Sequence, residues 1–379
     1  MMSLLLPFLY ARIPAFVLQI VITLNLRAPW NVAACAGIFY TCWICSQRAK
    51  TGIIFLDYSL GLEFGVTTMD VIHMTLLVRP LYVFRQLKQT ESADKLSWFE
   101  RFTWAGDLCG SPRGIGWHHQ VKNLPEGITN SRKEFVLSRL MSAAKHYVFF
   151  DLGLFYMKHN PAFTSPAAFV SQTKFIRRAL DCSVYMATNY FMVNVIFATT
   201  AVLMVSCTSA EPSSLPNIFG KWEDAYTIRR FWGRTWHQFL RRFVTPLGKK
   251  MTSILGFKPG TNGSSYTQLY TAFFFSATIH LIGDTVLNPS RPGISCPFFI
   301  CQAFAITFED MVIAAARRAG VKETKWTHVL GYVWVFSWFI VTETPWTAAV
   351  NMSGLANGGQ LLPKHFPPSL CDILVKFII

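Results

Sequence analysis

The sequence predicts an all-α protein that crosses a membrane about eight times, and three observations lead to this prediction. Hydrophobic residues make up 52% of the 379-residue chain and charged residues only 15%, whereas soluble domains average about 25% charged residues. Apolar stretches close to the length of a membrane span recur along the whole chain, with Lys and Arg gathered between them. Because no hydrophilic stretch is long enough to fold alone, residues 1–379 are expected to form a single membrane-embedded domain.

The net charge of +15 indicates contact with anionic membrane lipid. Lys and Arg lie between the apolar spans and in one basic-aromatic segment, as is typical of cytoplasmic membrane faces, so no nucleic-acid partner is expected. The nine cysteines are scattered. Cys42 and Cys45 form a lone Cys-X-X-Cys pair inside an apolar run, with no second pair and no histidine at metal-ligand spacing. Buried, inert thiols are therefore expected rather than a metal or redox site.

Five spans are predicted in the first 205 residues. Residues 1–26 lack a basic leading region and a clear cleavage site, so they are interpreted as a retained first span rather than a signal peptide. Further spans are predicted at about 30–45, 60–83, 135–157 and 182–205. The third of these is flanked or interrupted by Asp57, Glu63, Asp70 and His73. Either one side of that helix faces the protein interior, or these polar groups lie near the membrane surfaces.

Two long polar loops, residues 85–132 and 206–263, separate these spans from one another and from three later ones. The later spans are predicted at about 264–287, 294–316 and 328–350. Cytoplasmic loops carry an excess of Lys and Arg, which places both long loops and the basic connection 317–322 on the cytosolic side. Both chain ends then face the lumen.

The span at 264–287 contains the first candidate for chemistry, His280. The stretch is apolar for about twenty residues, roughly the length that a helix needs to cross the hydrocarbon core. An imidazole there is costly unless it faces protein, water or a ligand. A neutral histidine can take a proton from an alcohol that attacks a carbonyl, since its pKa lies close to working pH. The alternative is a core histidine that bonds to a neighbouring helix.

The segment 228–250, just upstream, is basic and aromatic together. On a helix, Trp232, Trp236 and Phe239 would share one face, and four arginines would form a basic rim: Arg230, Arg234, Arg241 and Arg242. This pattern is typical of a helix that lies in the membrane interface. A membrane-surface helix without chemistry explains the aromatic residues and the arginines equally well. It does not explain His237, a second imidazole within the segment.

The run FWGRTWHQFLRR at 231–242, followed by SATIH at 276–280, resembles the wax-synthase-like branch of the membrane-bound O-acyltransferase (MBOAT) superfamily. It is most similar to the fungal acetyltransferases of terpenoid and meroterpenoid biosynthesis, and the run RGIGW at 113–117 resembles a segment of those proteins. In this family a basic-aromatic loop with an Asn or His precedes a catalytic histidine in the membrane. The resemblance implies those roles for His237 and His280. Many relatives have Asn where this chain has His237.

The implied reaction is transfer of an acetyl group from acetyl-CoA, a co-substrate, to a hydroxyl of a hydrophobic terpenoid or meroterpenoid alcohol. His280 would be the base, and His237 or the Trp236 indole N–H would stabilise the thioester oxygen. Guanidinium groups bind phosphate in a fork, so the arginines are expected to hold the CoA phosphates, although contact with lipid headgroups is an equal alternative. The expected substrate-binding residues are Trp232, Arg234, Trp236, Arg241, Arg242, Glu309 and Asp310. No metal and no bound cofactor is expected.

Glu309 and Asp310 are adjacent acids inside a predicted span. They could pair with a histidine or an arginine, orient the acceptor alcohol, or cap a buried network.

Two other functions stay open at this point. One is a wax-ester synthase, which would use a long-chain acyl-CoA and a fatty alcohol. The other, from a different class, is a non-catalytic membrane transporter or scaffold. The sequence shows no repeat of one half in the other and no paired broken helices, which many transporters have. A multi-pass protein of the endoplasmic reticulum membrane is expected.

Overall fold

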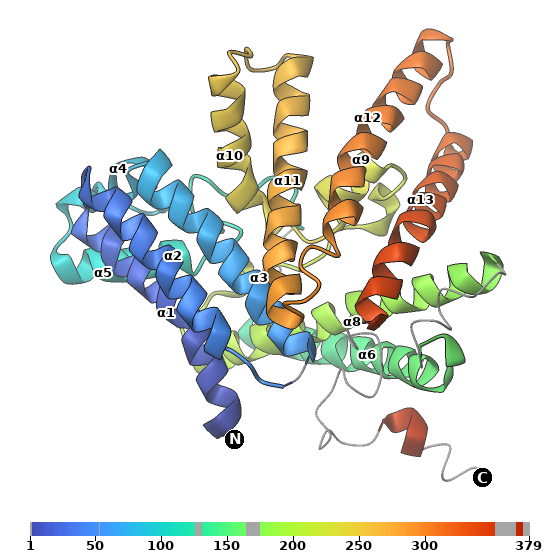
Figure 1. Ribbon diagram of the computed structural model, residues 1–379, viewed down its shortest axis with the longest axis horizontal. Helices are drawn as coiled ribbons and strands as arrows, with labels where there is room; N and C mark the ends of the chain where they lie inside the picture. Colours follow the sequence, from blue (N-terminus) through green and yellow to red (C-terminus); the bar gives the residue numbers. More distant parts are fainter. Residues whose placement is uncertain (1, 53, 126–130, 164–174, 353–368, 374–379) are drawn as a thin grey trace. The chain divides into compact units, whose positions relative to one another are not determined.

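The computed structural model describes residues 2–52, 54–125, 131–163, 175–352 and 369–373. Regular secondary structure in these ranges is helical (Figure 1), and the β pairing recorded there is an isolated bridge between Gln86 and Trp117. The contacts divide the chain into two compact units, each discontinuous in sequence. Unit 1 comprises residues 1–122 and 239–307, and unit 2 comprises residues 123–238 and 308–379. The single domain expected from the sequence stays a prediction.

Unit 1 is built from long helices that pack around an apolar core. In chain order they are α1 (Met2–Leu24), α2 (Trp30–Arg48), α3 (Ile54–Val71) with a π-helical continuation (Ile72–Leu77), the short α4 (Pro80–Val83), α5 (Trp98–Cys109), α10 (Arg241–Ile254) and α11 (Asn262–Leu287). Leu18 of α1, Ile38 of α2, Phe64 of α3 and Leu108 of α5 share one buried cluster. Cys42 and Cys45 lie in this cluster with apolar neighbours, so the expected burial of these thiols is confirmed.

Two glycines let α3 lie directly against α11. A methyl group added to Gly61 would come within 2.7 Å of the Cα atom of Gly283, and one added to Gly65 would come within 3.0 Å of the Cα and carbonyl oxygen of Ile279. Glycines four residues apart lie on one side of a helix and allow two backbones to approach closely. The α3–α11 spacing is therefore set by backbone contact, which leaves little freedom for the side chains nearby.

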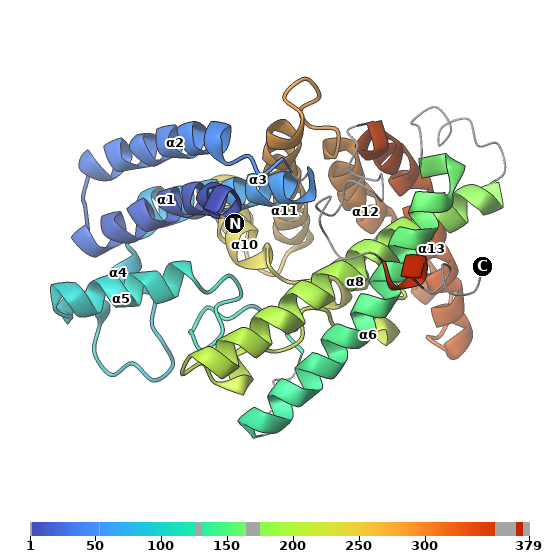
Figure 2. The ribbon, with the colours of Figure 1, turned by 90° about the horizontal axis from the view of Figure 1, so that it is seen from below.

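Unit 2 contains α6 (Arg132–His159), α8 (Phe175–Cys207), the one-turn α9 (Ile228–Arg230) with a π-helical continuation (Phe231–Thr235), and α13 (Lys325–Met352). Helix α12 (Cys296–Arg318) continues from unit 1 into unit 2 after Thr307. Helices α6 and α8 lie side by side (Figure 2). Asp181 of α8 is buried between them and accepts hydrogen bonds of 2.6 Å from the Tyr156 hydroxyl and the Asn160 amide.

Among the described residues, four helical segments are long and apolar enough to cross a membrane: Leu5–Leu24, Leu56–Leu77, Phe175–Cys207 and Cys296–Arg318. All eight predicted spans lie on helices, but a count of eight crossings is not confirmed. Helix α11, which carries His280, is outside the four. Its first turns hold Ser264, Ser265, Thr267 and Gln268, which lower its hydropathy.

The prediction that Trp232, Trp236 and Phe239 lie on one helix is wrong. The chain runs through α9 and its π-helical continuation, becomes extended at Trp236 (φ −69°, ψ 154°), and re-enters a helix only at Arg241. The Gln238 side-chain amide donates to the carbonyl oxygens of Trp232 (3.0 Å) and Trp236 (2.6 Å). These bonds stabilise the break, so Trp232, Trp236 and Phe239 do not share one helical face.

Two other boundaries also differ from the prediction. The third span begins at Ile54 and its helix ends at Leu77, because the chain is extended at Val78 ahead of Pro80. The loop 85–132 contains α5, which starts with a capping box in which Ser97 and Glu100 each accept the other's backbone N–H. Such a box stabilises the first turn of a helix.

Candidate active site

His280 lies on α11 and contacts side chains from two other helices of unit 1. Its Nδ1 atom is 2.7 Å from the Tyr58 hydroxyl oxygen, and Tyr58 is carried by α3, the helix held against α11 by the glycines. One face of the imidazole stacks on Phe299 of α12, with ring centroids 3.9 Å apart and 21° between the planes. These two contacts fix both the tilt of the ring and its rotation about the side-chain bonds.

Asp284, one turn beyond His280, fixes the start of α12. Its carboxylate accepts hydrogen bonds from the Ser295 backbone N–H (3.0 Å) and the Ser295 hydroxyl (2.7 Å), and both side chains are buried. Helix α12 begins at the next residue, and Phe299 lies one turn further on. The Asp284–Ser295 contact therefore places the ring on which His280 stacks.

Arg242 belongs to a buried ion pair in unit 1. Its guanidinium is 2.5 Å from the Asp70 carboxylate, and the two side chains are only 3% and 8% exposed. It also donates to the carbonyl oxygen of Leu108 at 3.4 Å. A buried carboxylate needs such a partner because an isolated buried charge is very costly. In the structure Arg242 thus joins α10 to α3 and α5.

Two histidines and one cysteine surround this ion pair. His73 and His119 both meet the ring of Phe84 edge-on, at centroid distances of 5.7 and 4.6 Å. Burial, with an added contribution from the positive charge of Arg242, lowers the pKa of His119 to about 4. Burial raises the pKa of the Cys109 thiol to about 12. At neutral pH the His119 ring and the Cys109 thiol are therefore uncharged, and the ion pair holds the charge of the cluster.

His237 lies in unit 2, within a group of aromatic rings. Its ring centroid is 5.5 Å from that of Trp236 and 6.1 Å from that of Phe219. Trp236 in turn lies against Phe231 at 5.5 Å and Trp232 at 6.2 Å. The extended residue Trp236 and the bonds made by Gln238 define the backbone on which His237 is carried.

Glu309 and Asp310 hold the start of the same segment. The Glu309 carboxylate accepts the backbone N–H groups of Ile228 (2.7 Å) and Arg229 (3.1 Å), as well as the Trp334 indole N–H (3.0 Å). Asp310 accepts two hydrogen bonds from the Arg229 guanidinium, at 3.1 and 2.5 Å. The first N–H groups of a helix lack partners within the helix, and a carboxylate there is favourable. Pairing with an arginine and capping of a buried backbone segment are both found, and a role of Glu309 and Asp310 in binding the acceptor stays a prediction.

The remaining arginines differ in their environment. Arg230 and Arg234 both form ion pairs with Asp224, and the Arg234 contact is long, at 3.5 Å, with an exposed side chain. Arg241, in unit 1, donates to the carbonyl oxygen of Lys122 at 3.3 Å, and burial lowers its pKa. These contacts of Arg234 and Arg241 are longer than the 2.5 Å contact between Arg242 and Asp70.

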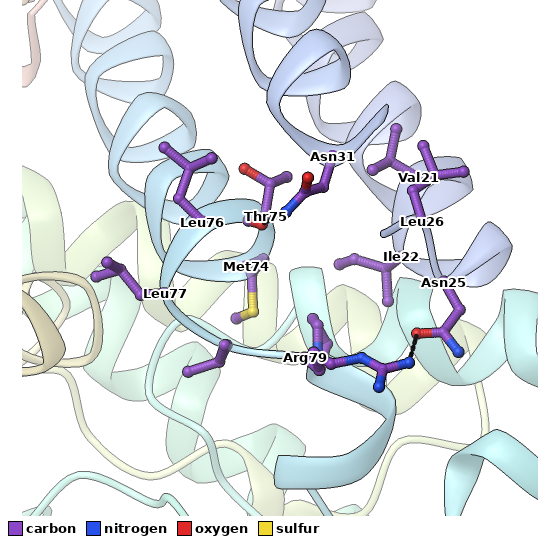
Figure 3. A pocket seen from close by; sticks show the side chains of 12 residues that line it. Val21, Ile22, Asn25, Leu26, Asn31, Met74, Thr75, Leu76, Leu77 and Arg79 are labelled. Atoms are coloured by element: carbon purple, nitrogen blue, oxygen red, sulfur yellow. Dashed lines mark hydrogen bonds between the residues drawn. The ribbon is translucent and has the colours of Figure 1, made fainter. Parts of the chain in front are cut away.

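A pocket of about 200 Å³ opens elsewhere in unit 1, where α1 ends and the π-helical stretch after α3 ends (Figure 3). Arg79 donates to the Asn25 side chain at 3.3 Å, and the Asn31 amide donates to the Thr75 carbonyl oxygen at 2.9 Å. None of the site residues predicted from the sequence lines this pocket. It is therefore separate from the candidate active-site residues.

Sequence reasoning missed Tyr58 and Phe299 as neighbours of His280. No motif marks either residue. The one available signal is the Gly61–Gly65 spacing, which predicts close helix packing for α3 but not the identity of the partner helix. Within the structure, His280, Arg241 and Arg242 belong to unit 1. The other predicted site residues belong to unit 2: Trp232, Arg234, Trp236, His237, Glu309 and Asp310.

Comparison with known proteins places this chain in a family. Residues 215–301 match the model of the membrane bound O-acyl transferase family, a range that includes both His237 and His280. The chain is 36% identical over 320 residues to acetyltransferase ple2 of Rhodocybe pseudopiperita, covering 82% of each protein. It is 30% identical over 308 residues to acetyltransferase eriL of Hericium erinaceus, covering 79% of this chain and 78% of that one. It is 28% identical over 267 residues to acetyltransferase sirH of Emericella nidulans, covering 69% and 62%.

The chain therefore belongs to the membrane-bound O-acyl transferase family, as its resemblance indicated. It is an O-acyltransferase, an enzyme that uses an acyl donor and an acceptor. Its apolar helices make it a membrane protein.

Proposed function

We propose that this enzyme transfers an acetyl group from acetyl-CoA to a hydroxyl of a hydrophobic terpenoid or meroterpenoid, as a multi-pass protein of the endoplasmic reticulum membrane. The observation that carries the proposal is the similarity to two proteins named acetyltransferases, over 82% and 79% of the chain. The match to the family model also spans the segment with His237 and His280.

His280 acts as the general base in this proposal. Its Nε2 atom takes the proton of the acceptor hydroxyl while the oxygen attacks the thioester carbonyl carbon. The tetrahedral intermediate collapses, the carbon–sulfur bond breaks, and the leaving CoA sulfur receives the proton from the imidazolium. General base catalysis of this kind contributes about 10²–10⁴-fold in rate. Support for the assignment comes from the fixed ring, held by Tyr58 and Phe299.

The negative charge that develops on the thioester oxygen needs a donor. We assign this role to His237, with the Trp236 indole N–H as the alternative donor. The phosphates of CoA need cations, and Arg234 and Arg241 fit this role better than Arg242, whose guanidinium already neutralises Asp70. Contact with lipid headgroups is the competing role for Arg234 and Arg241.

Microsomes that contain the protein test this function directly. They are incubated with labelled acetyl-CoA or labelled palmitoyl-CoA, each with a panel of terpenoid and fatty alcohols. The proposal expects acetyl esters of a terpenoid alcohol, and no product from the His280→Ala variant at equal protein level. Palmitoyl esters of fatty alcohols would instead make the enzyme a wax-ester synthase. Wild-type transfer by a folded His280→Ala protein would overturn the assignment of the base.

A further inference from the structure

The hydroxyl of Tyr58 lies within hydrogen-bond distance of His280, 222 residues away in sequence. The Tyr58 oxygen and the His280 Nδ1 atom are 2.7 Å apart, and Tyr58 is only 8% exposed. The contact joins α3 to α11 inside unit 1.

Close packing of the α3 and α11 backbones supports this contact. Gly61 lies one turn after Tyr58, and a methyl group on it would come within 2.7 Å of Gly283. A methyl group on Gly283 would in turn come within 3.0 Å of the Tyr58 ring. The glycines at this crossing therefore bring the tyrosine ring up to α11, and Phe299 closes one face of the imidazole. The close helix crossing and the stacked Phe299 ring together restrict both side chains.

A hydrogen bond at Nδ1 determines what Nε2 can do. In a neutral imidazole one nitrogen carries the proton and the other carries the lone pair. If Nδ1–H donates to the Tyr58 oxygen, the lone pair is on Nε2, and Nε2 can accept a proton from an alcohol. If instead the tyrosine hydroxyl donates to Nδ1, Nε2 carries hydrogen and cannot act as a base. When Nε2 takes up a proton, both nitrogens of the imidazolium are donors. Of the two hydrogen bonds, only the one from Nδ1–H to the Tyr58 oxygen is kept in that state.

We infer that Tyr58 is a positioning residue that accepts the Nδ1–H of His280, and so fixes the tautomer and orientation in which Nε2 is the base. This inference rests on the proposed role of His280. Orientation of a basic histidine by an acceptor at its other nitrogen is the arrangement that serine hydrolases achieve with a carboxylate. A neutral phenol oxygen supplies the same geometry. It stabilises the imidazolium less than a carboxylate does, because it carries no negative charge.

The test is Tyr58→Phe, which removes the oxygen and keeps the ring. A hydrogen bond of this kind contributes about 0.5–1.5 kcal/mol, or about 2–13-fold, so kcat should fall by about that factor while both KM values stay unchanged. The acid limb of the kcat/KM profile should move to lower pH, because the imidazolium loses its acceptor. Tyr270→Phe is the matched control. It removes a hydroxyl from α11 that contacts Thr307 at 3.2 Å, and should change neither kcat nor the pH profile.

A wild-type rate and pH profile in Tyr58→Phe would overturn the inference. If that variant is unstable in detergent, rates in intact microsomes are normalised to protein level for Tyr58→Gln and Tyr58→Leu. The amide oxygen of Gln can accept Nδ1–H, so Gln should be faster than Leu, and equal rates would again overturn the inference. The outcome for His280→Ala separates the two proposals. If His280→Ala loses activity and Tyr58→Phe behaves as wild type, only the proposed role of Tyr58 is rejected. If His280→Ala is active, the assignment of His280 as the base is rejected as well.

Discussion

At the scale of single residues, the two candidate histidines have different neighbours. We therefore expect them to tolerate different substitutions. His280 has a hydroxyl at Nδ1, and His237 lies against the rings of Trp236 and Phe219. We predict that His237→Ala loses much of the activity and that His237→Asn retains clearly more of it. An amide N–H can donate to the thioester oxygen, but it cannot accept a proton. Initial rates of labelled acetyl transfer at equal protein level measure the difference.

The same substitution at His280 provides the comparison. His280→Asn should be as inactive as His280→Ala, because the role proposed there needs a base rather than a donor. Equal losses in His237→Ala and His237→Asn would argue against His237 as a hydrogen-bond donor.

The arginines, although close in sequence, should separate into two groups when mutated. Arg242→Ala leaves Asp70 buried without its partner, which typically costs about 3–5 kcal/mol, so we expect a lower midpoint of thermal unfolding. Arg234→Ala and Arg241→Ala should instead raise the KM for acetyl-CoA more than that for the alcohol, with stability nearly unchanged. Thermal unfolding in detergent and steady-state kinetics give the two readouts.

A double variant checks the reason for the effect at Arg242. Replacing both members of the pair with apolar residues, as in Asp70→Leu with Arg242→Met, removes the unpaired charge and should recover much of the lost stability. A stable Arg242→Ala protein with a raised KM for acetyl-CoA would show that Arg242 binds substrate after all.

At the scale of elements, the basic-aromatic segment depends on a helix distant in sequence for its shape. Isolated helices shorter than about 12 residues are marginal in water, and the three residues of α9 with their π-helical continuation are far shorter. The Glu309 carboxylate is 5% exposed and binds the first two N–H groups of this segment. It thereby stabilises the segment together with the Thr227 hydroxyl, which accepts the Arg230 backbone N–H.

We predict that Glu309→Gln lowers kcat by about tenfold, because an amide NH₂ would face a backbone N–H donor and loosen the segment that carries His237. Asp310→Asn is the matched control. It weakens a half-exposed ion pair worth about 1 kcal/mol or less, so its effect should be smaller. Kinetics at equal protein level, with limited proteolysis around residue 228, provide the measurement. An equal or larger effect of Asp310→Asn would contradict the capping role of Glu309.

Elements were predictable from the sequence where one local pattern decides the structure. The predicted spans 182–205 and 328–350 lie within α8 and α13, because a long apolar run has few alternatives to a helix. The break at Trp236 was not predictable, since helical periodicity says nothing about the side-chain bonds of Gln238. The contacts of Glu309 with Ile228 and of Tyr58 with His280 join residues far apart in sequence. Such pairs follow from packing, which hydropathy and motif spacing do not specify.

At the scale of the whole molecule, the predicted orientation in the membrane rests only on the distribution of Lys and Arg among the loops. The positive charge of the long loops predicts that residues 206–263 lie in the cytosol and the α11–α12 connection in the lumen. The sequon at Asn262 begins α11, and we predict that it carries no glycan. The other sequon, Asn351-Met352-Ser353, extends beyond the described residues. A sequon close to the membrane can escape modification, so absence of glycan at Asn262 needs a stronger companion test.

That test uses one long flexible spacer with an Asn-X-Ser sequon, inserted in turn at two exposed turns. The first turn is at Gly260, before α11, and the second is at Ser290, between α11 and α12. Because a spacer holds its sequon away from the membrane, glycosylation then reports only which side the turn faces. The protein with the spacer at Ser290 should shift in mobility and lose the shift on endoglycosidase treatment, whereas the protein with the spacer at Gly260 should not shift. The reverse pattern would invert the orientation, and equal glycosylation of both would mean that α11 does not cross the membrane.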